Sequence, residues 1–168
     1  RDKFILEFTG MKIPFPIDEF LTVFENYNIA LWPLQLLFYA LAVAAIVLVI
    51  KDRPQSSRIV CAILAFFWVW MGLVYHILYF SAINKAAYIF GLVFIAQGII
   101  FLYQGSIKQK IRLTFALDLR GVIAIVLIVY ALVAYPLLGY LMGHVYPRTP
   151  TFGVPCPTTI FTFGVLLF

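Results

Sequence analysis

The chain has 168 residues, of which 64% are apolar, 18% aromatic and only 11% charged. A soluble domain is about half apolar and about a quarter charged, so this composition and the mean hydropathy of +1.03 exclude an ordinary soluble protein and indicate a membrane protein. The net charge of +5 does not indicate a nucleic-acid partner, because the basic residues are spread over short connectors rather than gathered in one patch.

The sequence is expected to be part of a longer chain. Met11 resembles a natural start, which makes Arg1–Gly10 an extension, and these residues lack the pattern of a secretory signal peptide. At the other end, the apolar run 158–168 is too short to cross a bilayer, because a spanning helix needs about 20 residues. We therefore expect this run to be the beginning of a longer helix.

Residues 16–27 are predicted to form an amphipathic helix. Ile17, Phe20, Leu21 and Phe24 recur at helical spacing, and acidic residues occupy the other side. Such a helix can lie in the outer interface of a membrane or cap the end of a helical bundle. Its acidic face disfavours attraction to anionic lipid and therefore favours the cap.

Four windows are long and apolar enough to cross a bilayer, and a fifth begins near the end of the chain. Their interiors carry almost no charge, as α-helices in lipid require, and the short connectors favour antiparallel packing of neighbouring helices. The predicted fold is an all-α integral membrane protein, a single helical bundle over 1–168 that follows the outer amphipathic helix. The predicted spans are 29–50, 59–80, 86–103, 121–142 and the truncated 158–168.

The basic residues predict the orientation of these spans. Connector 51–58 holds three Lys and Arg residues and connector 106–120 holds four, whereas the other two connectors hold one each. The positive-inside rule therefore places connectors 51–58 and 106–120 in the cytoplasm and the N-terminus outside. This bias fits a bacterial inner membrane.

The second span carries an aromatic stripe around a histidine. Its members at helical spacing are Trp68, Gly72, Tyr75, His76 and Tyr79. An ionisable side chain within a span is a candidate for function, and the glycine leaves room beside the imidazole. The stripe fits either a ligand site, joined by Tyr140 from the fourth span, or an aromatic packing face whose histidine bonds to a backbone carbonyl.

The third and fourth spans carry packing signals. Gly91, Gly98 and Gly105 recur seven residues apart, a spacing that lets another helix approach closely within the subunit or in a homo-oligomer. Pro136 is predicted to kink the fourth helix, and it shares a helical face with Tyr140 and His144.

Four prolines stiffen the segment that follows the fourth span, PRTPTFGVPCP. Pro157 fits the first position of the fifth helix, because its missing N–H costs nothing there. Cys156 is then expected at the N-cap, where the helix dipole favours a thiolate. Cys61 falls near the other end of the second span, about 30 Å of bilayer core away, so we expect no disulfide between the cysteines.

His76, His144 and Cys156 are all expected on the outer side of the membrane. Two imidazoles and a thiolate suit a soft metal ion such as copper, or zinc. The alternative is a stiff structural loop with a small buried cysteine, because the spacing matches no recognised metal-binding pattern.

Three classes of function fit these residues. The leading hypothesis is a transport or ligand-binding protein whose outward-facing mouth holds a small solute or soft metal ion. The second is an accessory subunit of a larger membrane complex that holds a quinone or a tetrapyrrole such as haem or a chlorin near His76. The third is a membrane enzyme with Cys156 as nucleophile, although the sequence contains no phosphate loop, nucleophile elbow or intramembrane carboxylate pair.

Three segments, MKIPFPIDEFLTVFENYNIALWP, AFFWVWMGLVYH and PTFGVPCPTTIFTFG, resemble a bacterial family of uncharacterised small multi-span membrane proteins. The likeness covers nearly everything after Gly10. Family members continue with further hydrophobic spans, which the resemblance also implies for this chain. The resemblance implies the membrane class and gives no activity.

Overall fold

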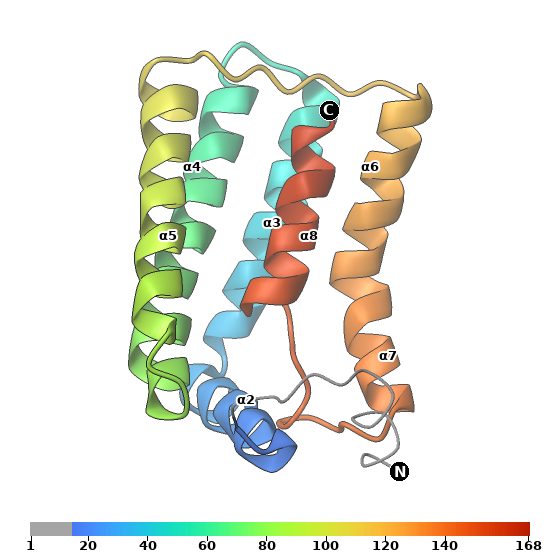
Figure 1. Cartoon of the computed structure of the whole chain (residues 1–168). Helices are drawn as coiled ribbons and strands as arrows, with labels where there is room; N and C mark the ends of the chain where they lie inside the picture. The colour runs from blue at the N-terminus through green and yellow to red at the C-terminus, as the bar shows by residue number, and fades with distance from the viewer. Residues whose placement is uncertain (1–14) are drawn as a thin grey trace.

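The computed structural model describes residues 15–168, and the regular secondary structure in this range is helical apart from one isolated bridge between Phe152 and Val154 (Figure 1). In the described part, four helices are long and apolar enough to cross a membrane, as predicted. The first is α3, and the second joins α4 to the π-helical η1 and the short 3-10 turn η2. The third joins α5 to η3, and the fourth joins α6, η4 and α7. Their bounds are α3 Leu34–Lys51, α4 Ser56–Trp70, η1 Met71–Tyr79, η2 Phe80–Ala82, α5 Ala87–Ile100, η3 Phe101–Ile107, α6 Leu119–Val129, η4 Tyr130–Ala134 and α7 Tyr135–Leu141.

Two shorter helices flank these spans, α2 (Ile17–Leu31) and α8 (Pro155–Leu166). The break between α2 and α3 corrects the prediction that the first span starts at residue 29. α2 ends just before Trp32 and Pro33, because a residue that precedes proline avoids the helical conformation. The predicted extension 1–10 and the predicted start at Met11 lie outside the described residues.

The other spans also differ from the predicted windows at their ends. The third helix continues to Ile107 rather than 103, and the fourth begins at Leu119 rather than 121. Asp118 caps this fourth helix, because its carboxylate accepts the N–H of Gly121 at 2.9 Å. Next to Pro136, where a kink is predicted, the fourth helix passes through the π-helical segment η4 before α7 begins.

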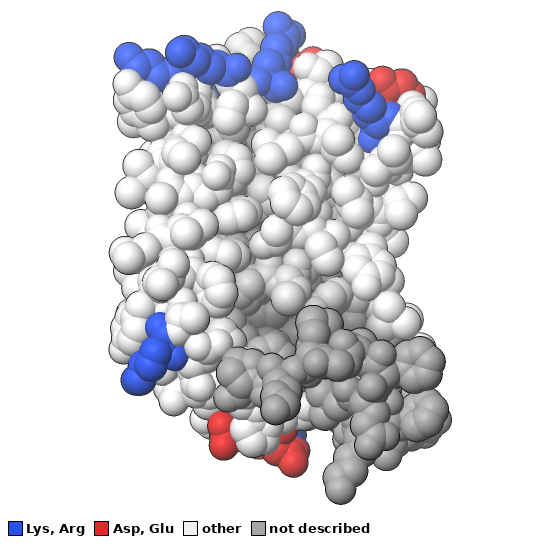
Figure 2. All heavy atoms as spheres, viewed as in Figure 1, with Lys and Arg blue, Asp and Glu red and all other residues white. Residues whose placement is uncertain are grey.

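The connectors divide the bundle into two ends of opposite character. The basic end comprises residues 51–58 and 106–120, whose seven Lys and Arg residues lie at one end of the molecule (Figure 2). The capped end comprises α2 and the segment 142–154, which lie at the opposite end (Figure 1). The two basic connectors therefore share one end of the bundle, as predicted.

The glycines of the third helix pack within the chain. A Cβ on Gly91 would lie 2.9 Å from the carbonyl oxygen of Gly72, and one on Gly98 would lie 3.0 Å from that of Ala65. Gly105 lies against Cys61 in the same way. Side chains at these glycines would push the second helix (α4 and η1) and the third helix (α5 and η3) apart, so the seam joins these two helices. A homo-oligomer stays a prediction.

α2 caps the bundle through apolar packing. Its buried residues Val23, Phe24 and Tyr27 form a cluster with Tyr75 and Phe80 of the second helix. The acidic residues of its first turn face solvent. The structure therefore favours the cap over a helix that lies in the membrane interface.

Candidate functional site

His76 is buried in the second helix, with 6% of its surface exposed. It lies in η1, and its ring centroid is 4.7 Å from that of Phe94 on α5. Neither ring nitrogen has a hydrogen-bond partner among the described residues, so the predicted bond to a backbone carbonyl is not formed. Aromatic packing surrounds the imidazole.

The predicted stripe around His76 divides into two faces. The Trp68 ring lies 4.6 Å from Phe94, the same ring that contacts His76. Tyr75 and Tyr79 instead contact Tyr27 of α2, with ring centroids 5.4 and 5.5 Å apart. The single face was predicted from α-helical spacing, but η1 is a π-helix, whose wider turns displace each successive side chain.

His144 lies in the segment 142–154 of the capped end, and Cys156 lies in the first turn of α8. α8 begins at Pro155 rather than Pro157, and Val154 is its N-cap, so the prediction that Cys156 caps the helix is wrong. Both prolines fit the first turn, where N–H groups have no intrahelical partner. Cys156 is exposed, and both cysteines are free.

The predicted soft-metal residues do not converge. In residues 15–168, no three His, Cys, Asp or Glu side chains are placed to hold a metal ion, so His76, His144 and Cys156 do not form such a group. His144 lines a hollow of about 260 Å³ with Tyr135. Tyr140, predicted as a ligand contact, is 60% exposed on α7.

The capped end is held by a dense polar network centred on Asn28, which is fully buried. Its side-chain amide donates to the carbonyl oxygens of Pro147 and Thr149 at 2.6 and 2.8 Å. Its carbonyl oxygen accepts from Gln35 at 2.7 Å and Thr151 at 2.9 Å. The network thus fastens α2 and α3 to the segment 142–154.

Tyr27 adds a second fastening between α2 and this segment. Its hydroxyl donates to the Gly153 carbonyl oxygen at 2.7 Å and accepts from the Trp70 indole N–H at 3.1 Å. Burial raises the pKa of Tyr27 above its ordinary value, so the hydroxyl keeps its proton and remains a donor. Because the side chains of Tyr27 and Asn28 bond to the segment 142–154, this end of the bundle is a structural joint.

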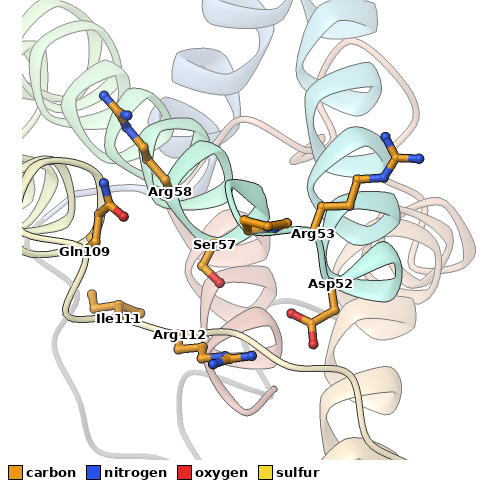
Figure 3. A pocket seen from close by; sticks show the side chains of 9 residues that line it. Asp52, Arg53, Ser57, Arg58, Gln109, Ile111 and Arg112 are labelled. Atoms are coloured by element: carbon orange, nitrogen blue, oxygen red, sulfur yellow. The ribbon is translucent and has the colours of Figure 1, made fainter.

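The basic end contains a different feature, a pocket of about 360 Å³ that we call the arginine pocket (Figure 3). It lies between the connector from α3 to α4 and the segment that follows η3. Its lining residues are Asp52, Arg53, Pro54, Ser57, Arg58, Gly105, Gln109, Ile111 and Arg112. Three of them are arginines, so the pocket is basic and polar.

One wall of the arginine pocket is the turn between α3 and α4. Asp52 ends α3 with a left-handed backbone (φ 38°), which turns the chain sharply. α4 begins four residues later at Ser56. Arg53 and Arg58 therefore stand on either side of this turn, and Figure 3 shows their side chains extending in different directions with Ser57 between them.

The opposite wall is the extended segment 108–118, which crosses the basic end from η3 to α6 (Figure 1). Its apolar residues Ile111, Leu113 and Phe115 alternate with exposed residues, so one side of the segment packs on the bundle. Leu113 is held by Ser57, whose hydroxyl oxygen accepts the Leu113 N–H at 3.0 Å. This anchor fixes Arg112 at the pocket.

The charge of the arginine pocket is not neutralised within residues 15–168. The ion pairs found in this range all involve Arg148 at the capped end, so Arg53, Arg58 and Arg112 have no carboxylate within 4.0 Å. Asp52 is the acidic residue of the lining, and Arg112 extends toward it in Figure 3. Three guanidinium groups and one carboxylate give the lining a net charge of +2.

These groups suit a phosphate-type anion. A guanidinium group donates two parallel hydrogen bonds to phosphate oxygens, and it stays charged at any physiological pH. Gln109 adds an amide donor to the same pocket.

The sequence alone indicated these arginines only as topology signals. The alternation of Ile111, Leu113 and Phe115 was the signal that could have placed Arg112 against the bundle.

Comparison with known families identifies the chain. Residues 17–168 match the model of a family of unknown function (DUF6064), and the chain belongs to this family. The match includes the PTFGVPCPTT segment and begins after Met11. No curated protein and no solved structure is significantly similar to the chain.

Proposed function

We propose that this DUF6064 protein is an integral membrane protein that binds a phosphate-type anion in the arginine pocket. The proposal puts the basic end in the cytoplasm of a bacterial cell, in line with the positive-inside rule. Four apolar helices of sufficient length and the separation of charge between the two ends support this orientation. The observation that carries the proposal is that three arginines, none of which has a carboxylate partner within residues 15–168, line one pocket.

The proposed activity is binding rather than passage through the bundle. Behind the pocket, the α4 residues Val60, Cys61 and Leu64 are fully buried in the apolar core. A phosphate that moved inward would lose its hydration shell and its hydrogen bonds to the arginines, and these three buried side chains offer no strong hydrogen-bond donor in exchange. Burying an unpaired charge in this way costs many kcal/mol. The pocket is therefore a site with a closed floor.

The test is calorimetric binding of inorganic phosphate to the purified protein in a maltoside detergent. The Arg112→Gln variant removes one charge from the pocket, and we expect about tenfold weaker binding, because a hydrogen bond to a charged group is worth about 1.5–3 kcal/mol. The matched control, Arg120→Gln, removes the same charge from the basic end outside the pocket and should change the affinity about twofold at most.

Asp52→Asn gives the opposite expectation. Asparagine tolerates the left-handed backbone at this position and removes the one negative charge of the lining, so phosphate should bind several-fold more tightly. The proposal fails if the wild-type protein binds no phosphate, or if Arg112→Gln and Arg120→Gln weaken binding equally.

A further inference from the structure

The arginine pocket lies at the boundary between the charged end and the apolar sides of the bundle. Arg58 lines the pocket, and the next residue, Ile59, is exposed on α4. On the other wall, Gln109 lines the pocket, and Ile107, which lies two residues earlier, is 62% exposed. Polar lining and exposed apolar side chains therefore meet at both walls.

A tyrosine and a lysine lie close in the chain to the residues that line the arginine pocket. Tyr103 is exposed near the end of the third helix, and the Lys108 ammonium group lies 5.5 Å from the centre of its ring. Tyrosine is enriched where a membrane meets water, and lysine extends its charge from the apolar region toward the headgroups. In a bilayer, this pair would place the arginine pocket at the depth of the lipid phosphates.

We infer that the ligand of the arginine pocket is the phosphate headgroup of an anionic membrane lipid; this inference rests on the proposed function. The arginines bind the phosphate, and the acyl chains lie along the exposed apolar residues beside the pocket, including Ile59 and Ile107. Basic pockets at the cytoplasmic ends of membrane helices recognise lipid headgroups through the same chemistry.

The charge of the basic end favours an anionic lipid over a zwitterionic one. Its seven Lys and Arg residues and two Asp residues give 7 − 2 = +5. A choline headgroup would bring its own cation close to the arginines, whereas a phosphatidylglycerol headgroup brings none. A preference for phosphatidylglycerol over phosphatidylcholine therefore distinguishes recognition of the headgroup by the arginines from simple hydrophobic association of the acyl chains.

Native mass spectrometry can test the inference with the protein released from nanodiscs of equimolar phosphatidylglycerol and phosphatidylcholine. We expect one phosphatidylglycerol to remain bound in preference to phosphatidylcholine, and excess inorganic phosphate should displace it poorly. Arg58→Gln should lower the bound fraction about tenfold, whereas Arg120→Gln should leave it unchanged within about twofold. Asp52→Asn should increase it, which supplies a gain that a misfolded protein cannot give.

Each result decides between the inference and the proposed function. A bound phosphatidylglycerol that depends on Arg58 supports both. Arginine-dependent binding of inorganic phosphate without any preference for phosphatidylglycerol overturns the lipid inference and leaves the proposed function standing. A bound lipid that persists unchanged in Arg58→Gln overturns the inference, because that lipid lies elsewhere. Loss of both phosphate and lipid binding in the wild type overturns both.

Discussion

The capped end and the basic end use polar side chains in opposite ways. At the capped end, Asn28 is fully buried and all of its side-chain hydrogen-bonding groups have protein partners. At the basic end, Arg53, Arg58 and Arg112 are exposed around a pocket and have no ion-pair partner within the described residues. A saturated network stabilises a fold, whereas unpaired cations around a pocket remain available to a ligand.

This difference predicts which measurement responds to mutation at each end. Substitutions in the capped end should lower the free energy of unfolding and leave anion affinity unchanged. Substitutions of the arginines in the arginine pocket should weaken anion binding and leave the free energy of unfolding nearly unchanged.

Asn28→Leu should lower the free energy of unfolding by about 3–5 kcal/mol, because leucine keeps the branched shape of asparagine but leaves two carbonyl groups and the Gln35 amide without partners. Equilibrium unfolding of the detergent-solubilised protein measures the change. Asn26→Leu is the matched control, because Asn26 is exposed on the same helix. Equal effects at both positions would show that the network around Asn28 is not a joint.

Tyr27→Phe should cost about 1–2 kcal/mol of unfolding free energy, because it removes a hydroxyl that bonds to the buried Gly153 carbonyl and to the half-buried Trp70 indole. Thermal unfolding followed by tryptophan fluorescence gives the comparison with Tyr140→Phe, whose hydroxyl lies on an exposed side chain. If the Tyr27→Phe protein is as stable as Tyr140→Phe, the Tyr27 hydroxyl does not stabilise the contact between α2 and the segment 142–154.

Arg58→Gln should weaken phosphate binding about tenfold and change the free energy of unfolding by less than about 0.5 kcal/mol. The side chain is exposed, and the hydrogen bond from Ser106 goes to the backbone oxygen of Arg58, which the substitution keeps. Calorimetry and unfolding on the same preparation measure both quantities. A large loss of stability would show that Arg58 belongs to the fold rather than to a site.

Arg148→Gln should have the smallest effect, below about 1 kcal/mol. Arg148 pairs with Asp18 at 3.2 Å and with Glu25 at 3.5 Å on the surface of the capped end. Exposed pairs are screened by salt, so the difference between wild type and variant should shrink as the ionic strength rises. A difference that is independent of salt would indicate a contribution other than the ion pairs.

Composition predicted the apolar helices well, but local rules misplaced several of their ends. Pro33 was included in a predicted span because the window around it is apolar, yet proline separates α2 from α3. Pro157 was predicted as the first residue of α8, but the helix begins two residues earlier at Pro155. Hydropathy averages over about 20 residues and cannot resolve such boundaries.

The candidate site depended on contacts that sequence spacing does not encode. Arg58 and Arg112 are far apart in the chain, and Leu113 brings them to one pocket by bonding to Ser57. His76 stood out as an ionisable residue in a span, but π-helical turns divide its aromatic neighbours between two faces. Tertiary contacts and a local change of helix type were therefore the missing information.

The most direct test compares two double variants of equal net charge by calorimetry with inorganic phosphate. Arg58→Gln with Arg112→Gln removes two charges from the arginine pocket, and Lys51→Gln with Arg120→Gln removes two charges from the same end outside it. We predict that the first protein loses measurable phosphate binding while the second stays within about threefold of the wild type. Equal losses in both would contradict a pocket and attribute binding to the overall charge of the basic end.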